Sequence, residues 1–120
     1  MALNRGNLGF TTQIGAASTV AVYTVGAAQT AYIKSVLLHN LDNTVAQTVY
    51  LHVVQNSGGS VGTASSINQV ARLGIPVSDT FFFEPAYPIT LEATGDSLQV
   101  YNSGTVVNSI NVMVLGDKEV

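Results

Sequence analysis

From residue 18 onward, apolar and polar residues alternate along most of the chain, and no segment of useful length shows a helical period. The 120 residues include 17 Val, 6 Ile and 12 Thr. These β-branched side chains are stiff at χ1 and suit a pleated surface. Because helical crossovers for a parallel sheet are missing, the pattern predicts an all-β fold with antiparallel strands.

We expect about seven or eight strands, at the roughly 8–12-residue spacing of a sandwich or barrel. The clearest segments run from Thr30 to Asn40 and from Gln47 to Gln55, and the short loop between them predicts an antiparallel hairpin. Further strands are expected at 18–25, 67–74, 77–84, 89–92, 98–101 and 106–115, followed by a charged tail at 116–120. We predict a single antiparallel β-sandwich, of jelly-roll or immunoglobulin-like type.

Two segments carry apolar residues on both predicted faces. Near Val36-Leu37-Leu38 the strand is either covered on both sides or bulged. Neighbouring residues of a strand point to opposite faces, so Phe81, Phe82 and Phe83 cannot all enter one core. We expect Phe82 to point away from the side that Phe81 and Phe83 occupy. An outward Phe is typical of a protein interface, where aromatics are enriched, but a strand buried on both sides explains it equally.

Residues 1–18 are interpreted as an extended N-terminal arm, and residues 19–120 as the sandwich domain. Glycines interrupt the arm, and its apolar residues are spaced too irregularly for a helix. Such an arm is either a frayed terminus or a segment docked in a groove of its own or a neighbouring domain. The sandwich is expected to fold without it. The candidate interface residues are Leu3, Leu8, Phe10 and Ile14 in the arm, with Phe82 in the domain.

Charged residues make up only 9% of the chain and hydrophobic residues 47%, with a net charge of -3; ordinary globular proteins are about 25% charged. Four Lys and Arg in all are too few for nucleic-acid binding. We find no apolar stretch typical of a signal peptide or a membrane span, so we expect synthesis in the cytoplasm and no membrane partner. The neutral polar surface fits either an extracellular-type β-domain or a subunit that neighbours cover.

No catalytic or cofactor signature is apparent. The chain has no Cys, which excludes disulfides, thiolate zinc sites and thiol catalysis. His39 and His52 lie on adjacent predicted strands, but a metal site needs a third ligand, for which only Asp42 is near in sequence. No GxSxG motif occurs, and the Gly-rich segment 56–63 lacks the Lys-Ser/Thr of a phosphate loop. We expect a non-enzymatic protein without metal or cofactor.

The remaining acids are dispersed along the chain and do not suggest the carboxylate pair of a glycosidase. They are Asp79, Glu84, Glu92 and Asp96.

The segments 22–25, 31–40 and 49–53, with the strand–turn–strand at 88–100, resemble small β-sandwich virion proteins of tailed bacteriophages. The resemblance covers roughly residues 20–116 and rests on strand patterns and turn residues. It implies a virion structural protein, in first place a capsid decoration (cement) protein that binds the major capsid protein and stabilises the shell. It also implies a homo-oligomer, for which a trimer would match the local symmetry of a capsid surface. The alternative within the same group is a tail or adaptor subunit.

A third interpretation comes from the aromatic residues, because sugar-binding modules use exposed aromatic rings as stacking platforms. The chain has five Tyr and four Phe but no Trp. We therefore place a carbohydrate- or receptor-binding module after the two virion roles.

Overall fold

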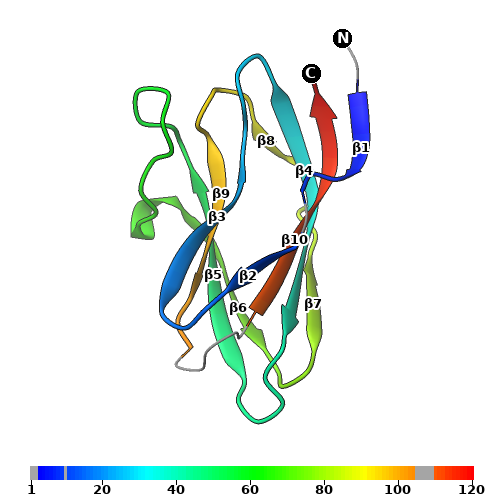
Figure 1. Cartoon of the computed structure of the whole chain (residues 1–120), viewed down its shortest axis with the longest axis vertical. Helices are drawn as coiled ribbons and strands as arrows, with labels where there is room; N and C mark the ends of the chain where they lie inside the picture. The colour runs from blue at the N-terminus through cyan, green and yellow to red at the C-terminus, as the bar shows by residue number, and fades with distance from the viewer. Residues whose placement is uncertain (1–2, 10, 105–109) are drawn as a thin grey trace.

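The computed structural model describes residues 3–9, 11–104 and 110–120, and confirms an all-β sandwich of two antiparallel sheets (Figure 1). The large sheet contains β1 (Leu3–Asn7), β2 (Thr12–Ile14), β4 (Thr30–Asn40), β7 (Thr80–Phe83), β8 (Ile89–Leu91) and β10 (Ile110–Glu119). The small sheet contains β3 (Ser18–Thr24), β5 (Gln47–Val54), β6 (Gln69–Ile75) and β9 (Ser97–Asn102). A short 3-10 turn, η1 (Ser66–Asn68), precedes β6.

The ten strands exceed the expected number because each edge of the large sheet is divided between two short strands. The order of this sheet is β1-β10-β4-β7, with β2 also paired to β10 and β8 also paired to β4. The order of the small sheet is β3-β9-β5-β6. Among the described strands, β5 and β6 are the only consecutive pair that are hydrogen-bonded to each other.

The predicted hairpin between residues 30–40 and 47–55 is wrong, although both strands form. β4 lies in the large sheet, while β5 lies in the small sheet between β6 and β9. The connection between β4 and β5 crosses the end of the sandwich. Its length allows either a hairpin or such a crossing, so the choice depends on contacts distant in sequence.

The buried Asn40 side chain holds this crossing in place. Its Nδ2 lies 3.1 Å from the carbonyl oxygens of Val45, Ile75 and Pro76, and its Oδ1 accepts a hydrogen bond from the Asp42 N–H at 2.9 Å. The end of β4 is thereby tied both to its own loop and to the end of β6. The Asn40 amide thus supplies hydrogen bonds to backbone groups at this end of the sandwich, and buried polar groups need such partners.

A β-bulge in the central pair decides which side chains of β4 enter the core. The register of β4 against β10 shifts between Leu115 and Gly116, where Lys34 is the additional residue of β4. Ile33 is buried before the bulge, and Val36 and Leu38 are buried after it. Leu37 lies four positions after Ile33, which in a regular strand would place both side chains on one face, but the bulge reverses the alternation and Leu37 faces outward. Of the two explanations offered for the apolar residues near Val36, the register shows the bulge.

The core lies between the two sheets and is made of aliphatic side chains from both. Its fully or almost fully buried members are Ile14, Val25, Ala31, Ile33, Val36, Leu38, Val49, Leu51, Ile75, Leu91, Leu98, Val100, Ile110, Val112 and Val114. Burial of this apolar surface is the main favourable term for folding.

Both chain ends differ from the expectation, because residues 3–7 and 12–14 pair with β10 as strands of the large sheet. The described part of the predicted arm therefore belongs to the domain. The predicted charged tail is also wrong, since β10 continues to Glu119 between β1 and β4. Charged residues are uncommon in strands, but these lie at the end of a sheet, where Lys34 Nζ pairs with Asp117 Oδ2 at 2.6 Å.

Asp96 organises the loops at one end of the small sheet. Its Oδ1 accepts hydrogen bonds from the backbone N–H and the side-chain Nδ2 of Asn56 at 2.8 and 2.9 Å, and its Oδ2 accepts one from the Ala93 N–H at 3.1 Å. Burial raises the pKa of this carboxyl, but the hydrogen bonds from Asn56, Ala93 and Glu92 outweigh it, so the pKa lies below its usual value. Asp96 is thus a structural acid that joins the loop after β5 to the turn before β9.

We predict that Gly116→Ala lowers the free energy of unfolding by about 1–3 kcal/mol, the usual cost of overpacking. A Cβ at this buried position would overlap the backbone carbonyl of Tyr32 and come within 3.1 Å of the Ile33 Cα. Urea denaturation followed by circular dichroism measures the change.

The matched control is Gly74→Ala in β6, where a Cβ would meet no atom within 4 Å. This substitution should change stability by no more than about 0.5 kcal/mol. Equal losses in the two variants would contradict the steric explanation for Gly116.

We also predict that Asp96→Asn destabilises the protein near neutral pH and has little effect in acid. Since the folded-state pKa of Asp96 is lowered from 3.8, the carboxylate contributes stability above that pH and loses it as the pH falls through the lowered value. Urea midpoints of both proteins, measured near neutral pH and well below 3.8, should differ only in the first condition. A difference that stays constant with pH would refute this role.

Candidate binding surfaces on the two sheets

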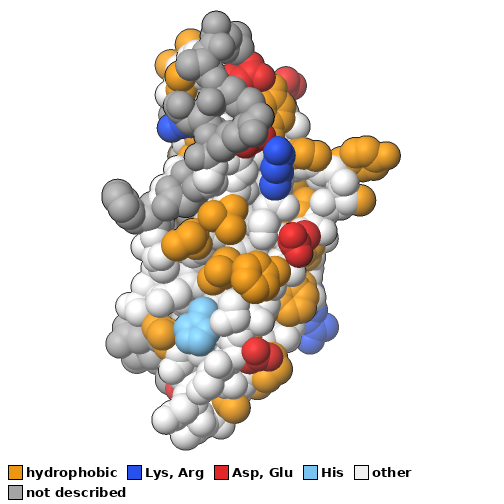
Figure 2. Space-filling view, turned by 90° about the vertical axis from the view of Figure 1, so that its right-hand side faces the viewer, with side chains coloured by type: hydrophobic (Ala, Val, Ile, Leu, Met, Phe, Trp, Pro, Cys, Tyr) orange, Lys and Arg blue, Asp and Glu red, His pale blue; other side chains and the backbone are white. Residues whose placement is uncertain are grey.

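The outer face of the large sheet carries a row of apolar side chains. Met113 on β10 is paired with Leu37 on β4, which is paired with Phe82 on β7, and Leu115 follows Met113 on the same face. We call these four residues the outer apolar patch. Phe82 is 54% exposed, and the other three are partly exposed. Figure 2 shows hydrophobic side chains gathered in the middle of this face.

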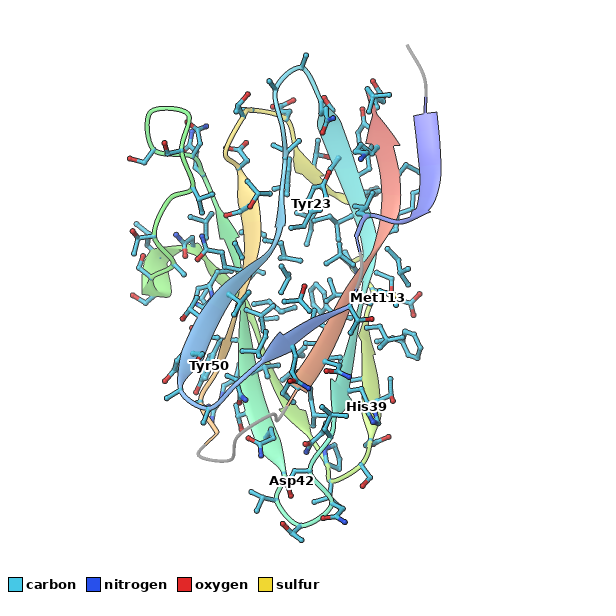
Figure 3. The ribbon with its side chains drawn as sticks, viewed as in Figure 1. Tyr23, His39, Asp42, Tyr50 and Met113 are labelled. Atoms are coloured by element: carbon cyan, nitrogen blue, oxygen red, sulfur yellow. The ribbon has the colours of Figure 1, made fainter. Side chains whose placement is uncertain are left out.

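A neutral polar row borders the patch on one side. Gln13, Asn111, His39 and Thr80 are successive partners across β2, β10, β4 and β7. The Gln13 Nε2 donates to the Asn111 Oδ1 at 3.3 Å, and the His39 Nδ1 lies 2.9 Å from the Thr80 Oγ1. Figure 3 labels His39 and Met113 on this outer side of the sheet.

Charged residues border the opposite side of the patch. Besides the Lys34–Asp117 pair, the Tyr32 hydroxyl donates to the Glu119 Oε1 at 2.7 Å. This hydrogen bond is the main cause that raises the pKa of the Tyr32 phenol above its usual value. The face thus has an uncharged apolar centre and a polar rim, which is the anatomy of many protein interfaces.

The outer face of the small sheet carries a shallow pocket of about 460 Å³. Tyr50 and His52 are two residues apart on β5 and therefore share its outward face. β9 places Tyr101 opposite Tyr50. The two tyrosine rings have their centroids 5.8 Å apart and are inclined by 35°, and the Arg72 Cζ lies 5.9 Å from the centroid of Tyr50.

The segment that leads from β5 to β6 forms the second side of this pocket through Ala64, Ser65 and Ser66. It folds over the sheet, where the Gln99 Nε2 donates to the Gly62 carbonyl oxygen at 2.9 Å. The Gly/Ser-rich segment 56–63 is exposed along most of its length and is anchored at this point. The pocket is therefore bounded by rigid sheet on one side and by an anchored loop on the other.

The residues that the sequence predicted for an interface lie in different environments. Ile14 is fully buried in the core, so its assignment to an interface is wrong: the β2 pairing with β10 turns it inward. Leu8 is half-buried and packs against the same core. Phe10 and the side chain of Leu3 lie outside the described residues. The predicted outward orientation of Phe82 is confirmed, while Phe83 packs against the core.

The structure does not bring the two histidines together. His39 lies on the outer face of the large sheet, and His52 lies on β5 of the small sheet. Across residues 3–9, 11–104 and 110–120, no three His, Asp or Glu side chains are grouped so that they could hold a metal ion. The acid nearest in sequence, Asp42, instead accepts hydrogen bonds from Thr44 and Val45, which lower the pKa of its carboxyl.

Sequence reasoning missed the pocket. The alternation around Tyr50 and His52 identifies side chains on one face of a strand, but it does not reveal that Tyr101 is their neighbour. Tyr101 is 51 positions from Tyr50 in the sequence and is brought there by the pairing of β5 with β9.

No helix in the described part of the chain has the length and apolar character needed to cross a membrane. No protein-family model matches the chain, and no curated protein matches its sequence.

Proposed function

We propose that this protein is a non-enzymatic structural subunit of a bacteriophage virion, and in particular a capsid decoration protein. It would bind the outer surface of the major capsid protein through the outer face of its large sheet. The observation that carries this proposal is the outer apolar patch, where Leu37, Phe82, Met113 and Leu115 lie side by side with a polar rim. Exposed apolar side chains that are contiguous and rimmed by polar groups mark interaction sites.

Of the two sandwich types expected, jelly-roll and immunoglobulin-like, the strand order supports the jelly-roll arrangement. If β1 with β2 and β7 with β8 each count as one divided strand, each sheet has four strand positions. The chain then changes sheet at every connection except β5–β6. Jelly rolls of eight strands occur in viral capsid and lectin domains. A shared fold does not imply a shared function, so the proposed function rests on the outer apolar patch.

The charge distribution supports docking by apolar contact instead of electrostatic attraction. The patch itself contains no charged residue, and Lys34 and Asp117 at its rim pair with each other. Burying the patch on assembly would release water from apolar surface with little desolvation of charge. A subunit that binds only the assembled shell stabilises that shell by mass action.

We further propose that the subunit acts as a homo-oligomer, because the low charge of its surface offers little repulsion between copies. The resemblance to virion proteins favours a trimer. The tail or adaptor role uses the same contacts to join subunits in rings. Localisation of the protein in the purified virion separates the two roles.

We predict that Phe82→Ser weakens binding to capsid shells by about tenfold or more, since an aromatic anchor in an interface commonly contributes over 1 kcal/mol. Shells assembled without the protein are mixed with the purified chain, and the bound fraction is measured by co-sedimentation. Phe82 is more than half exposed, so the fold should survive the substitution.

The matched control is Ile67→Ser, which removes a 93% exposed apolar side chain from η1 beside the small sheet. It should bind shells as the unchanged protein does. Equal binding by Phe82→Ser and the unchanged protein would exclude this docking face, and a protein found only on the tail would favour the adaptor role.

Deletion of residues 2–18 does not test the proposal. It would remove β2 and the core residue Ile14, so lost binding would reflect an unfolded domain.

A further inference from the structure

We propose that the pocket on the small sheet binds one neutral hexopyranose unit of a glycan. This site lies on the opposite side of the sandwich from the outer apolar patch, as the positions of Tyr50 and Met113 in Figure 3 show. A subunit docked through its large sheet would therefore present the pocket to its surroundings. The inference adds a binding activity that is independent of the shell contact.

The size of the pocket suits a small ligand. Its volume of about 460 Å³ falls within the range of roughly 300–1,000 Å³ that is usual for small-molecule sites. The side that β5 and β9 provide is rigid sheet, which fixes the positions of Tyr50 and Tyr101. A site built on strands holds its side chains more accurately than one built only on loops.

The two tyrosines supply an aromatic surface. The faces of aromatic rings carry partial negative charge and attract the polarised C–H groups on one face of a pyranose. The Tyr50 and Tyr101 rings adjoin each other at a shallow angle. Arg72 on the neighbouring strand β6 places its Cζ over the Tyr50 ring, 5.9 Å from the ring centroid. This arrangement provides an apolar area with hydroxyl groups at its margin.

His52 provides a hydrogen-bonding group that the protein leaves unused. Its side chain lines the pocket and is only 6% exposed, and its Nδ1 has no partner among the described residues. A buried polar atom without a partner is costly, and such atoms are rare in native proteins. The imidazole has a nitrogen on each side of the ring, and no hydrogen bond joins it to a described residue, so a ligand hydroxyl can bond to it without breaking a protein hydrogen bond.

The remaining polar groups around the pocket favour a neutral ligand over an anion or a cation. They are the hydroxyls of Thr19, Ser65, Ser66 and Ser103 and the amide of Gln69. Of the described residues that line the pocket, none is Asp, Glu, Lys or Arg, and the single Arg72 guanidinium over the Tyr50 ring is no cluster of basic residues. A nucleotide could stack on the tyrosines, but its phosphates require clustered basic residues. Hydroxyl and amide groups around an aromatic surface match the hydroxyl pattern of a neutral sugar.

The experiment titrates the full-length, ¹⁵N-labelled protein with the methyl glycosides of glucose, galactose, mannose and N-acetylglucosamine, each followed by NMR. At least one should give saturable shifts at Tyr50, His52 and Tyr101, with a dissociation constant in the millimolar range. Tyr50→Ala should weaken that binding by about tenfold or more, since stacking on an aromatic ring contributes much of the affinity. Tyr87→Ala, which removes an 85% exposed ring outside the pocket, should leave it unchanged.

His52→Leu is the second variant, and it separates a ligand-binding role from a structural one. Replacing an unpaired buried polar group by an apolar one of similar size should leave stability equal or higher, while sugar affinity falls about tenfold. Oligosaccharides that end in the preferred sugar should bind at least as well as its methyl glycoside if the natural ligand is a longer glycan. Weaker binding of every such oligosaccharide than of the methyl glycoside would contradict the assignment to a glycan unit.

Three other results would overturn the proposal: no saturable shift with any of the four glycosides, shifts that survive both pocket substitutions, or saturation of the same signals by inorganic phosphate. Shell binding by Phe82→Ser is measured separately, so failure of one proposal leaves the other standing.

Discussion

The pairing of β4 with β10 at the centre of the large sheet is the constraint on which the rest of the structure depends. These strands run side by side over almost their full lengths, and the bulge within them reverses the alternation of β4. Without that reversal, Leu37 would share a face with Ile33, and Val36 and Leu38 would face solvent. Gly116 permits the close approach at this point, since a side chain there would overlap the backbone of Tyr32. One irregularity thus determines both the core and the outer apolar patch.

The two candidate binding surfaces are the backs of the two sheets. In a sandwich each strand supplies alternate side chains to the core and to the outside, so a surface is built from the same strands that stabilise the fold. The large sheet presents apolar side chains in a row, and the small sheet presents two tyrosines and a histidine below a loop. These surfaces differ in chemistry, and they therefore suit two different kinds of partner.

The low charge of the chain has a structural counterpart in these surfaces. The acids Asp42, Asp79 and Asp96 accept hydrogen bonds from backbone N–H groups in loops. Lys34 and Asp117 pair with each other at the end of the large sheet. These charges organise the structure locally, and the outer apolar patch is left uncharged.

The sequence alone determined the all-β class, the limits of the strand at Thr30–Asn40 and the outward direction of Phe82. Each of these follows from local alternation, because neighbouring side chains of a strand must point to opposite faces. Only the tertiary structure decided that β5 joins the other sheet, that Ile14 enters the core and that β10 extends to Glu119. Those features depend on which distant strand supplies the hydrogen-bonding partner, and alternation within one strand carries no information about that partner.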